Sequence, residues 1–213
     1  MAASIAAHGG AHDDHGDHGH EEIIYQETRD MRLMGFVLFL FSDVVLFSSY
    51  IFAYIYLRNS IPAWPPNDPV TGHQLPRLDT AFAAFNSVVL FGSGVTMHWA
   101  LENWKHAKRG GFNLFMLLTI ILGLGFLGGQ AYEYAHAQIG GWSGNTFGAS
   151  FFTLTGMHGI HVFLGVCFLI ALWIQTSRGV YTQTKFFGLT AGTLYWHFVD
   201  VIWVVLFFLF YLW

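Results

Sequence analysis

Five long apolar stretches, each carrying at most one charged residue, constrain this 213-residue chain more than any other feature. We place these stretches at residues 33–57, 80–101, 112–132, 150–174 and 189–213. Each is long enough to cross a hydrocarbon core, which needs roughly 20 residues of helix. Lipid offers the backbone no hydrogen-bond partners, and the stretches lack the alternation of barrel strands. The sequence therefore predicts an all-α polytopic membrane protein, a bundle of five transmembrane helices.

The composition supports a membrane protein and excludes several other classes. Hydrophobic residues make up 54% of the chain and charged residues only 10%, whereas a soluble domain averages about 25% charged residues. Nine scattered basic residues and a net charge of -4 provide no surface for nucleic acid. The single cysteine, Cys167, excludes an internal disulfide and a thiolate metal cluster.

The first thirty residues differ sharply from the rest, because they are rich in His, Asp and Glu. We expect a disordered tail over 1–30 and one five-helix domain over 31–213. The spacing of His12, His15 and His18 is compatible with a divalent metal, but a solvated histidine tract is the favoured interpretation.

The basic residues are distributed unequally between the two ends of the predicted spans. The side that holds the N-terminus carries seven of them, and the other side carries Arg58 and Arg77. The seven are Arg29, Arg32, Lys105, Lys108, Arg109, Arg178 and Lys185. Because basic residues are retained in the cytoplasm, this predicts a cytoplasmic N-terminus and an external C-terminus.

Two carboxylates lie deep inside predicted spans. Asp43 and Asp200 are both roughly 15 Å from the predicted cytoplasmic ends, at 1.5 Å per residue. A carboxylate at that depth is costly unless it is protonated, paired or hydrated. Asp43 is therefore a candidate for supporting proton uptake or contacting a lipid headgroup, with a structural carboxyl as the alternative. For Asp200 a structural role is favoured, because His197 lies one turn earlier on the same face.

Histidines in the fourth and fifth spans allow either metal ligation or a polar packing network. His158 and His161 share one face of the fourth span, and no carboxylate lies one turn away. We favour a buried network of His158, His161, His197 and Asp200 between these two helices over a metal or haem site. Glu133, at the end of the third span, is interpreted as a solvated interfacial carboxylate. We predict no catalytic residue and no metal site in this chain.

Several sequence runs, distributed in order over residues 35–213, occur together in a known family. They are Leu40-Phe-Ser-Asp-Val-Val-Leu-Phe47, Phe85-Asn-Ser-Val-Val-Leu90, Gly128-Gly-Gln-Ala-Tyr-Glu-Tyr134, Phe151-Phe-Thr-Leu-Thr-Gly-Met-His-Gly-Ile-His-Val162 and Tyr195-Trp-His-Phe-Val-Asp-Val-Ile-Trp203. With these runs the chain resembles subunit III of the haem-copper respiratory oxidases, in the shorter five-helix form.

The resemblance implies a subunit without redox centres of its own. Such a subunit packs against the catalytic subunit I, in a complex that also contains subunit II, and haem and copper belong to these partners. It also holds phospholipid and supports proton uptake. The resemblance further implies a bacterial plasma (inner) membrane and electrons from cytochrome c.

Two alternatives remain beside this interpretation. Asp43 stands where cytochrome c oxidases usually carry Glu, and Asp is familiar in the quinol-oxidising relatives, so a quinol oxidase subunit is one alternative. The other is a membrane cytochrome b that carries electrons on a bis-His haem. Its ligands would come from His98, His158, His161 and His197.

Overall fold

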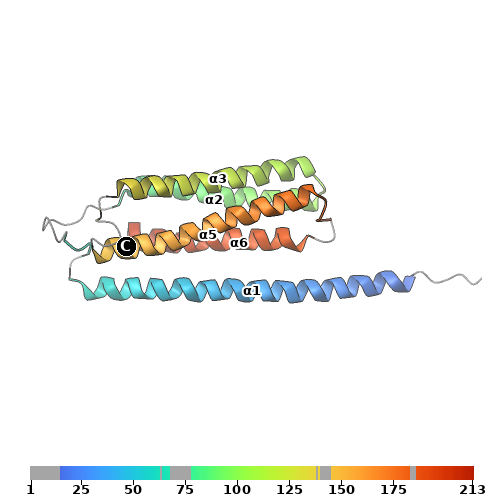
Figure 1. Cartoon of the computed structure of the whole chain (residues 1–213), viewed down its shortest axis with the longest axis horizontal. Coiled ribbons are helices and arrows are strands. Elements are labelled where there is room, and N and C mark those ends of the chain that lie inside the picture. Colours follow the sequence, from blue (N-terminus) through green and yellow to red (C-terminus); the bar gives the residue numbers. More distant parts are fainter. Residues whose placement is uncertain (1–14, 63, 68–77, 138, 140–144, 183–185) are drawn as a thin grey trace, which may run out of the picture. The chain divides into compact units, whose positions relative to one another are not determined.

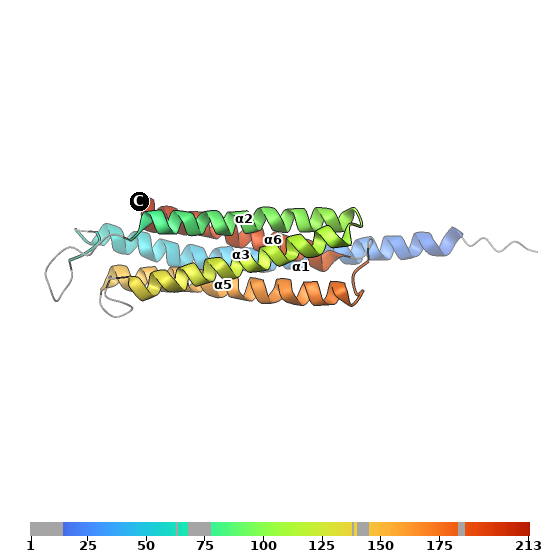
Figure 2. The same cartoon turned by 90° about the horizontal axis from the view of Figure 1, so that it is seen from above.

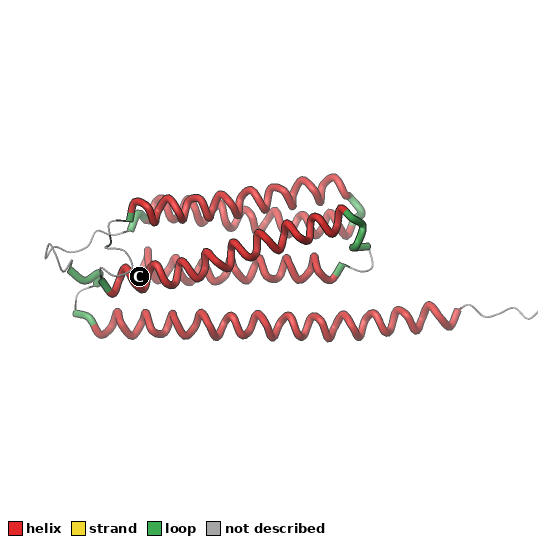
Figure 3. The backbone as a smooth tube through the Cα atoms, in the orientation of Figure 1, coloured by secondary structure: helices red, strands yellow, loops and turns green. Residues whose placement is uncertain are grey.

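The computed structural model describes residues 15–62, 64–67, 78–137, 139, 145–182 and 186–213, with side chains from Asp30 onward. Every long element among the described residues is a helix (Figures 1 and 3). The elements are α1 (His15–Ser60), α2 (Thr80–Lys105), α3 (Arg109–His136), α5 (Thr146–Ser177), α6 (Phe187–Phe207) and the π-helical turn η1 (Phe208–Leu212).

The five predicted spans are confirmed. Helical segments long and apolar enough to cross a membrane are Asp30–Ser60, Thr80–Lys105, Arg109–His136, Thr146–Ser177 and Phe187–Leu212. Most are a few residues longer than predicted, because polar residues at the membrane surface continue a helix that the apolar run has already formed. The N-terminus of α2 is fixed at Thr80, because Asp79 caps the helix there. Its Oδ1 accepts hydrogen bonds from the N–H groups of Ala81 and Phe82 at 3.0 and 3.1 Å.

The N-terminal segment differs from the expected disordered tail. Helix α1 begins at His15, so residues 15–30 are helical, and residues 1–14 lie outside the described residues. The helix extends this far because adding a turn to an existing helix is far easier than nucleating a new one. The chain divides into two units, Met1–Leu38 and Phe39–Trp213, and the following description concerns the second unit.

Helices α2, α3, α5 and α6 lie along one another (Figures 1 and 2) and meet around the indole of Trp196. This side chain is 0% exposed, and its Nε1 donates a hydrogen bond to Ser93 Oγ on α2 at 2.9 Å. A Cβ atom added to Gly123 of α3 would lie 2.8 Å from the ring, and one added to Gly165 of α5 would lie 3.0 Å from it. Glycines on two helices therefore allow one α6 indole to contact three neighbours.

A second tryptophan repeats this arrangement two turns further along α6. Trp203 Nε1 donates to Ser87 Oγ on α2 at 2.8 Å, and the Phe126 ring packs edge-on against the indole at 4.8 Å. Hydrogen bonds between helices are favoured in a membrane because lipid cannot satisfy the donors. The two indole N–H groups thus fix the register of α6 against α2.

We predict that Gly123→Leu destabilises the helix bundle by about 1–3 kcal/mol, the usual cost of overpacking a core. The added side chain would collide with the indole of Trp196. Gly128→Leu on the same helix is the matched control, because a Cβ there has no neighbour within 4 Å. The midpoint of SDS-induced unfolding in detergent micelles measures both variants, and equal midpoints would contradict the prediction.

Candidate functional site

One narrow face of α1 carries the intramembrane carboxylate Asp43. From Phe39 to Ser60 the buried side chains are Asp43, Phe47 and Tyr54, which are spaced four and seven residues apart. This spacing places them on a single helix face. Most of the remaining apolar side chains of this segment are exposed, among them Val44, Val45, Leu46, Phe52 and Tyr56.

Asp43 faces His161 of α5. Their side chains are 13% and 12% exposed, and Asp43 Oδ2 lies 3.9 Å from His161 Nε2. The other ring nitrogen, Nδ1, lies 2.8 Å from the carbonyl oxygen of Met157 and must donate to it, because a carbonyl can only accept. In a neutral ring this leaves Nε2 as an acceptor, facing a carboxylate that is also an acceptor. An ionised Asp43 and a neutral His161 ring therefore present acceptors to each other, and a proton on Nε2 or on the carboxyl would turn this repulsion into attraction.

Two aromatic residues contact His161 beside this pair. The Phe47 ring lies 5.0 Å from the His161 ring, between ring centroids. Tyr195 of α6 donates its hydroxyl to the backbone carbonyl of His161 at 3.0 Å. The pair is thus a point where α1, α5 and α6 meet, and Tyr195 is a member that the sequence analysis did not identify.

Asp200 lies in a different environment, between α6 and α2. Its Oδ2 is 3.7 Å from His197 Nδ1, the partner that the sequence predicted, and His197 remains partly exposed. A Cβ added to Gly94 of α2 would lie 2.3 Å from the same carboxylate oxygen. Asp200 can therefore lie against the α2 backbone only because residue 94 has no side chain.

His158 does not join either carboxylate. Its ring is 0% exposed, stacks on Trp203 at 5.1 Å and meets Phe126 edge-on at 5.9 Å. Neither ring nitrogen has a hydrogen-bond partner among the described residues. The predicted single network of four residues is thus divided into three settings, because His161 faces α1, His158 faces the aromatic core, and only His197 and Asp200 lie together.

The expected solvated carboxylate Glu133 is half-buried in the structure. Its Oε1 accepts a hydrogen bond from the Tyr211 hydroxyl at 2.7 Å. Tyr211 belongs to η1, where the chain returns to the end of α3. Glu133 therefore links α3 to the C-terminal turn, a contact between residues 78 positions apart that local sequence does not indicate.

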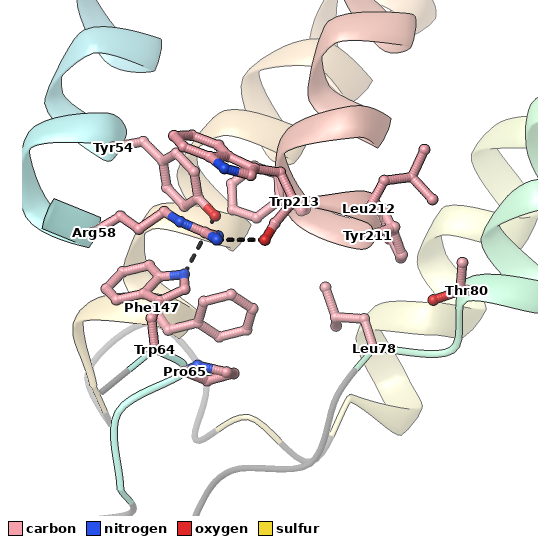
Figure 4. Close-up of a pocket in the computed structure, with 11 residues that line it drawn as sticks. Tyr54, Arg58, Trp64, Pro65, Leu78, Thr80, Phe147, Tyr211, Leu212 and Trp213 are labelled. Atoms are coloured by element: carbon pink, nitrogen blue, oxygen red, sulfur yellow. Dashed lines mark hydrogen bonds between the residues drawn. The ribbon is translucent and has the colours of Figure 1, made fainter. Parts of the chain in front are cut away.

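At the same end of the bundle, α1 lies beside a cavity of about 230 Å³ (Figure 4). Side chains that line this cavity connect α1 to the C-terminal turn. The Tyr54 hydroxyl donates to the carbonyl of Leu209 at 3.0 Å and accepts from Trp64 Nε1 at 3.3 Å. Arg58 donates to the carbonyl of Trp213, and its guanidinium lies 4.3 Å from the centroid of that indole. These contacts attach the end of α1 to η1.

The described histidines at membrane depth lie in separate surroundings. No three His, Cys, Asp or Glu side chains in the described part of the chain lie together as candidate ligands. The His158 ring lies against the rings of Trp203 and Phe126, and His98 is exposed on α2. Two carboxylate–imidazole pairs, Asp43 with His161 and Asp200 with His197, lie at this depth.

Comparison with known proteins gives one family over almost the whole chain. The family model described as cytochrome c oxidase subunit III matches residues 15–213. A cytochrome c oxidase subunit 3 of Synechocystis sp. is 38% identical over 93% of this chain and 79% of its own length. Proteins of the same name from Thermostichus vulcanus and Mus musculus are 33% and 35% identical, over 92% and 84% of this chain and 91% and 68% of their own lengths. The chain belongs to the cytochrome c oxidase subunit III family.

Proposed function

We propose that this chain is a non-catalytic subunit of a terminal oxidase that reduces oxygen to water with electrons from cytochrome c. The observation that carries the proposal is the family match over residues 15–213. Haem and copper then belong to the partner subunits I and II, and this chain stabilises the catalytic subunit. The relatives named above are cytochrome c oxidase subunits, which favours cytochrome c over quinol as the donor.

Within such a complex, α1 would contact phospholipid and support proton uptake. Its segment from Phe39 to Ser60 exposes a broad apolar surface that fits phospholipid chains. On its narrow buried face, Asp43 and His161 lie 3.9 Å apart, so a proton on one side chain would attract the other. A carboxyl that can exchange this proton beside the catalytic subunit would help to keep proton delivery in step with turnover.

We assign the chain to a bacterial plasma membrane, with the end that contains Lys105, Lys108 and Arg109 in the cytoplasm. The support is the excess of seven basic residues over two on the side of the N-terminus. Trp213 would then lie on the outer side.

The first test is the composition and activity of the complex. Purification through an affinity tag on this chain should recover haem and copper in partner subunits, and oxygen consumption with reduced cytochrome c but not with quinol. The separated chain should show no Soret band. A haem spectrum that stays with the isolated chain would refute the proposal. Consumption of oxygen with quinol alone would show that quinol, and not cytochrome c, is the electron donor.

Asp43→Asn should shorten the active lifetime of the oxidase during turnover while leaving its haem content unchanged. An Asn amide has nearly the same shape as the carboxyl but does not ionise, so the variant removes the exchangeable proton and keeps the packing. The exposed neighbour Ser42→Ala is the control. Oxygen consumption recorded until activity is lost measures the effect, and equal rates of inactivation for Asp43→Asn and the parent would count against the role.

The orientation can be tested by thiol labelling. In a Cys167→Ser background, which removes the exposed native thiol, we compare Asn59→Cys with Ala107→Cys, two exposed positions at opposite ends. A membrane-impermeant maleimide should label Asn59→Cys in intact cells and Ala107→Cys only after the cells are opened. The reverse pattern would show that the chain is inserted the other way.

A further inference from the structure

A second cavity, of about 230 Å³, lies at the end of the bundle that carries the turn between α2 and α3. It is formed where α2 ends, α3 begins and α5 ends. Its lining consists of Trp104, Arg109, Phe112, Asn113, Thr176 and Ser177. None of these residues takes part in the contacts of α1, Asp43 or Asp200 described above.

Trp104, a lining residue of this cavity, has an unused hydrogen-bond donor. The residue is 1% exposed, and its Nε1 has no acceptor among the described residues. This differs from Trp196 and Trp203, whose indole N–H groups both reach a serine hydroxyl. An indole N–H can only donate, and a buried donor without an acceptor is uncommon in native structures. The donor therefore points to an acceptor that the described residues do not supply.

Arg109 adds a positive charge to the same wall. Its guanidinium lies 5.4 Å from the centroid of the Trp104 ring, a distance at which a cation is attracted to an aromatic face. No carboxylate within the described ranges pairs with Arg109, because the nearby Glu102 pairs with Lys105 and His106 at 3.3 and 3.5 Å. The guanidinium thus remains available to a ligand that enters the cavity.

The first turn of α3 contributes further donors. Helix α3 begins at Arg109, its first turn contains no acidic residue, and the N-cap Lys108 makes no side-chain capping bond. The N-terminus of a helix attracts anions through its free N–H groups and its dipole. Asn113 uses Oδ1 to accept a hydrogen bond from Trp173 at 3.1 Å, which leaves its amide N–H groups to donate.

From this set of donors we infer that the cavity binds a phosphate group. The groups available to a ligand are an arginine, an indole N–H, an amide and a helix N-terminus, and the lining contains no carboxylate. Such a lining suits a tetrahedral anion with several acceptor oxygens. The volume is several times the roughly 30 Å³ that one water molecule occupies, so a phosphate group fits with water around it.

The position of the cavity suggests where the phosphate comes from. Trp104 lies one residue before the end of α2, Arg109 is the first residue of α3, and Ser177 is the last residue of α5. These are the ends of membrane-spanning segments, where lipid headgroups lie. A phospholipid headgroup and free inorganic phosphate present the same chemistry here. The site is separate from the α1 surface of the proposed function and does not depend on it.

The test measures binding to the complex as purified from its membrane and stripped of lipid in detergent. Native mass spectrometry follows titration with phosphatidylglycerol in one series and with inorganic phosphate in the other. Arg109→Gln should weaken binding about tenfold and Trp104→Phe about threefold, since each removes a donor to a charged acceptor. Arg178→Gln is the matched control, because it removes an exposed charge at the end of α5 without lining the cavity.

Each outcome decides the inference. If phosphatidylglycerol binds with this dependence on the variants and inorganic phosphate does not displace it, the ligand is a lipid headgroup. If inorganic phosphate shows the dependence, the ligand is free phosphate. Equal weakening by Arg178→Gln, or no difference between the parent and Arg109→Gln, overturns the inference. Arg109 is exposed, so this variant tests the site even if Trp104→Phe does not assemble, and the yield of the purified chain with its partners reports assembly independently.

Discussion

The contact between Trp196 and its three neighbouring helices is the interaction on which the bundle depends. In a bilayer, burial of apolar surface does not distinguish a neighbouring helix from lipid, so packing and hydrogen bonds must hold the helices together. Trp196 supplies both, because Gly123 and Gly165 admit its ring and Ser93 accepts its N–H. Trp203 and Ser87 repeat the hydrogen bond further along α6. The positions of Asp200, His158 and His161 all follow from this placement of α6 against its neighbours.

On that frame, the buried ionisable side chains are arranged by pairs. Asp43 meets His161 between α1 and α5, and Asp200 meets His197 against the bare backbone of Gly94. Each pair couples a carboxylate to an imidazole, so each can carry a proton without placing a lone charge in hydrocarbon. Among the described residues His158 has no such partner, and its ring packs against aromatic rings, which suits a packing role.

The sequence predicted some of this arrangement and not the rest, for physical reasons. The five spans were predictable, because a long apolar run has few alternatives to a membrane helix. The pairing of His197 with Asp200 was also predictable, since residues three apart share a helix face. The contact of Asp43 with His161 was not, because it depends on which helices are neighbours. The spacing of Asp43, Phe47 and Tyr54 would have indicated the buried face of α1, but not its partner.

The narrow buried face of α1 restricts the rotation of this helix about its axis. Slipping an α-helix by one residue along a screw turns it by about 100°. For α1 such a slip would carry the carboxyl of Asp43 away from its imidazole and into the fatty surroundings, while Tyr54 would lose the carbonyl of Leu209. Two polar side chains three turns apart, Asp43 and Tyr54, therefore keep their partners at only one rotation of α1 about its axis.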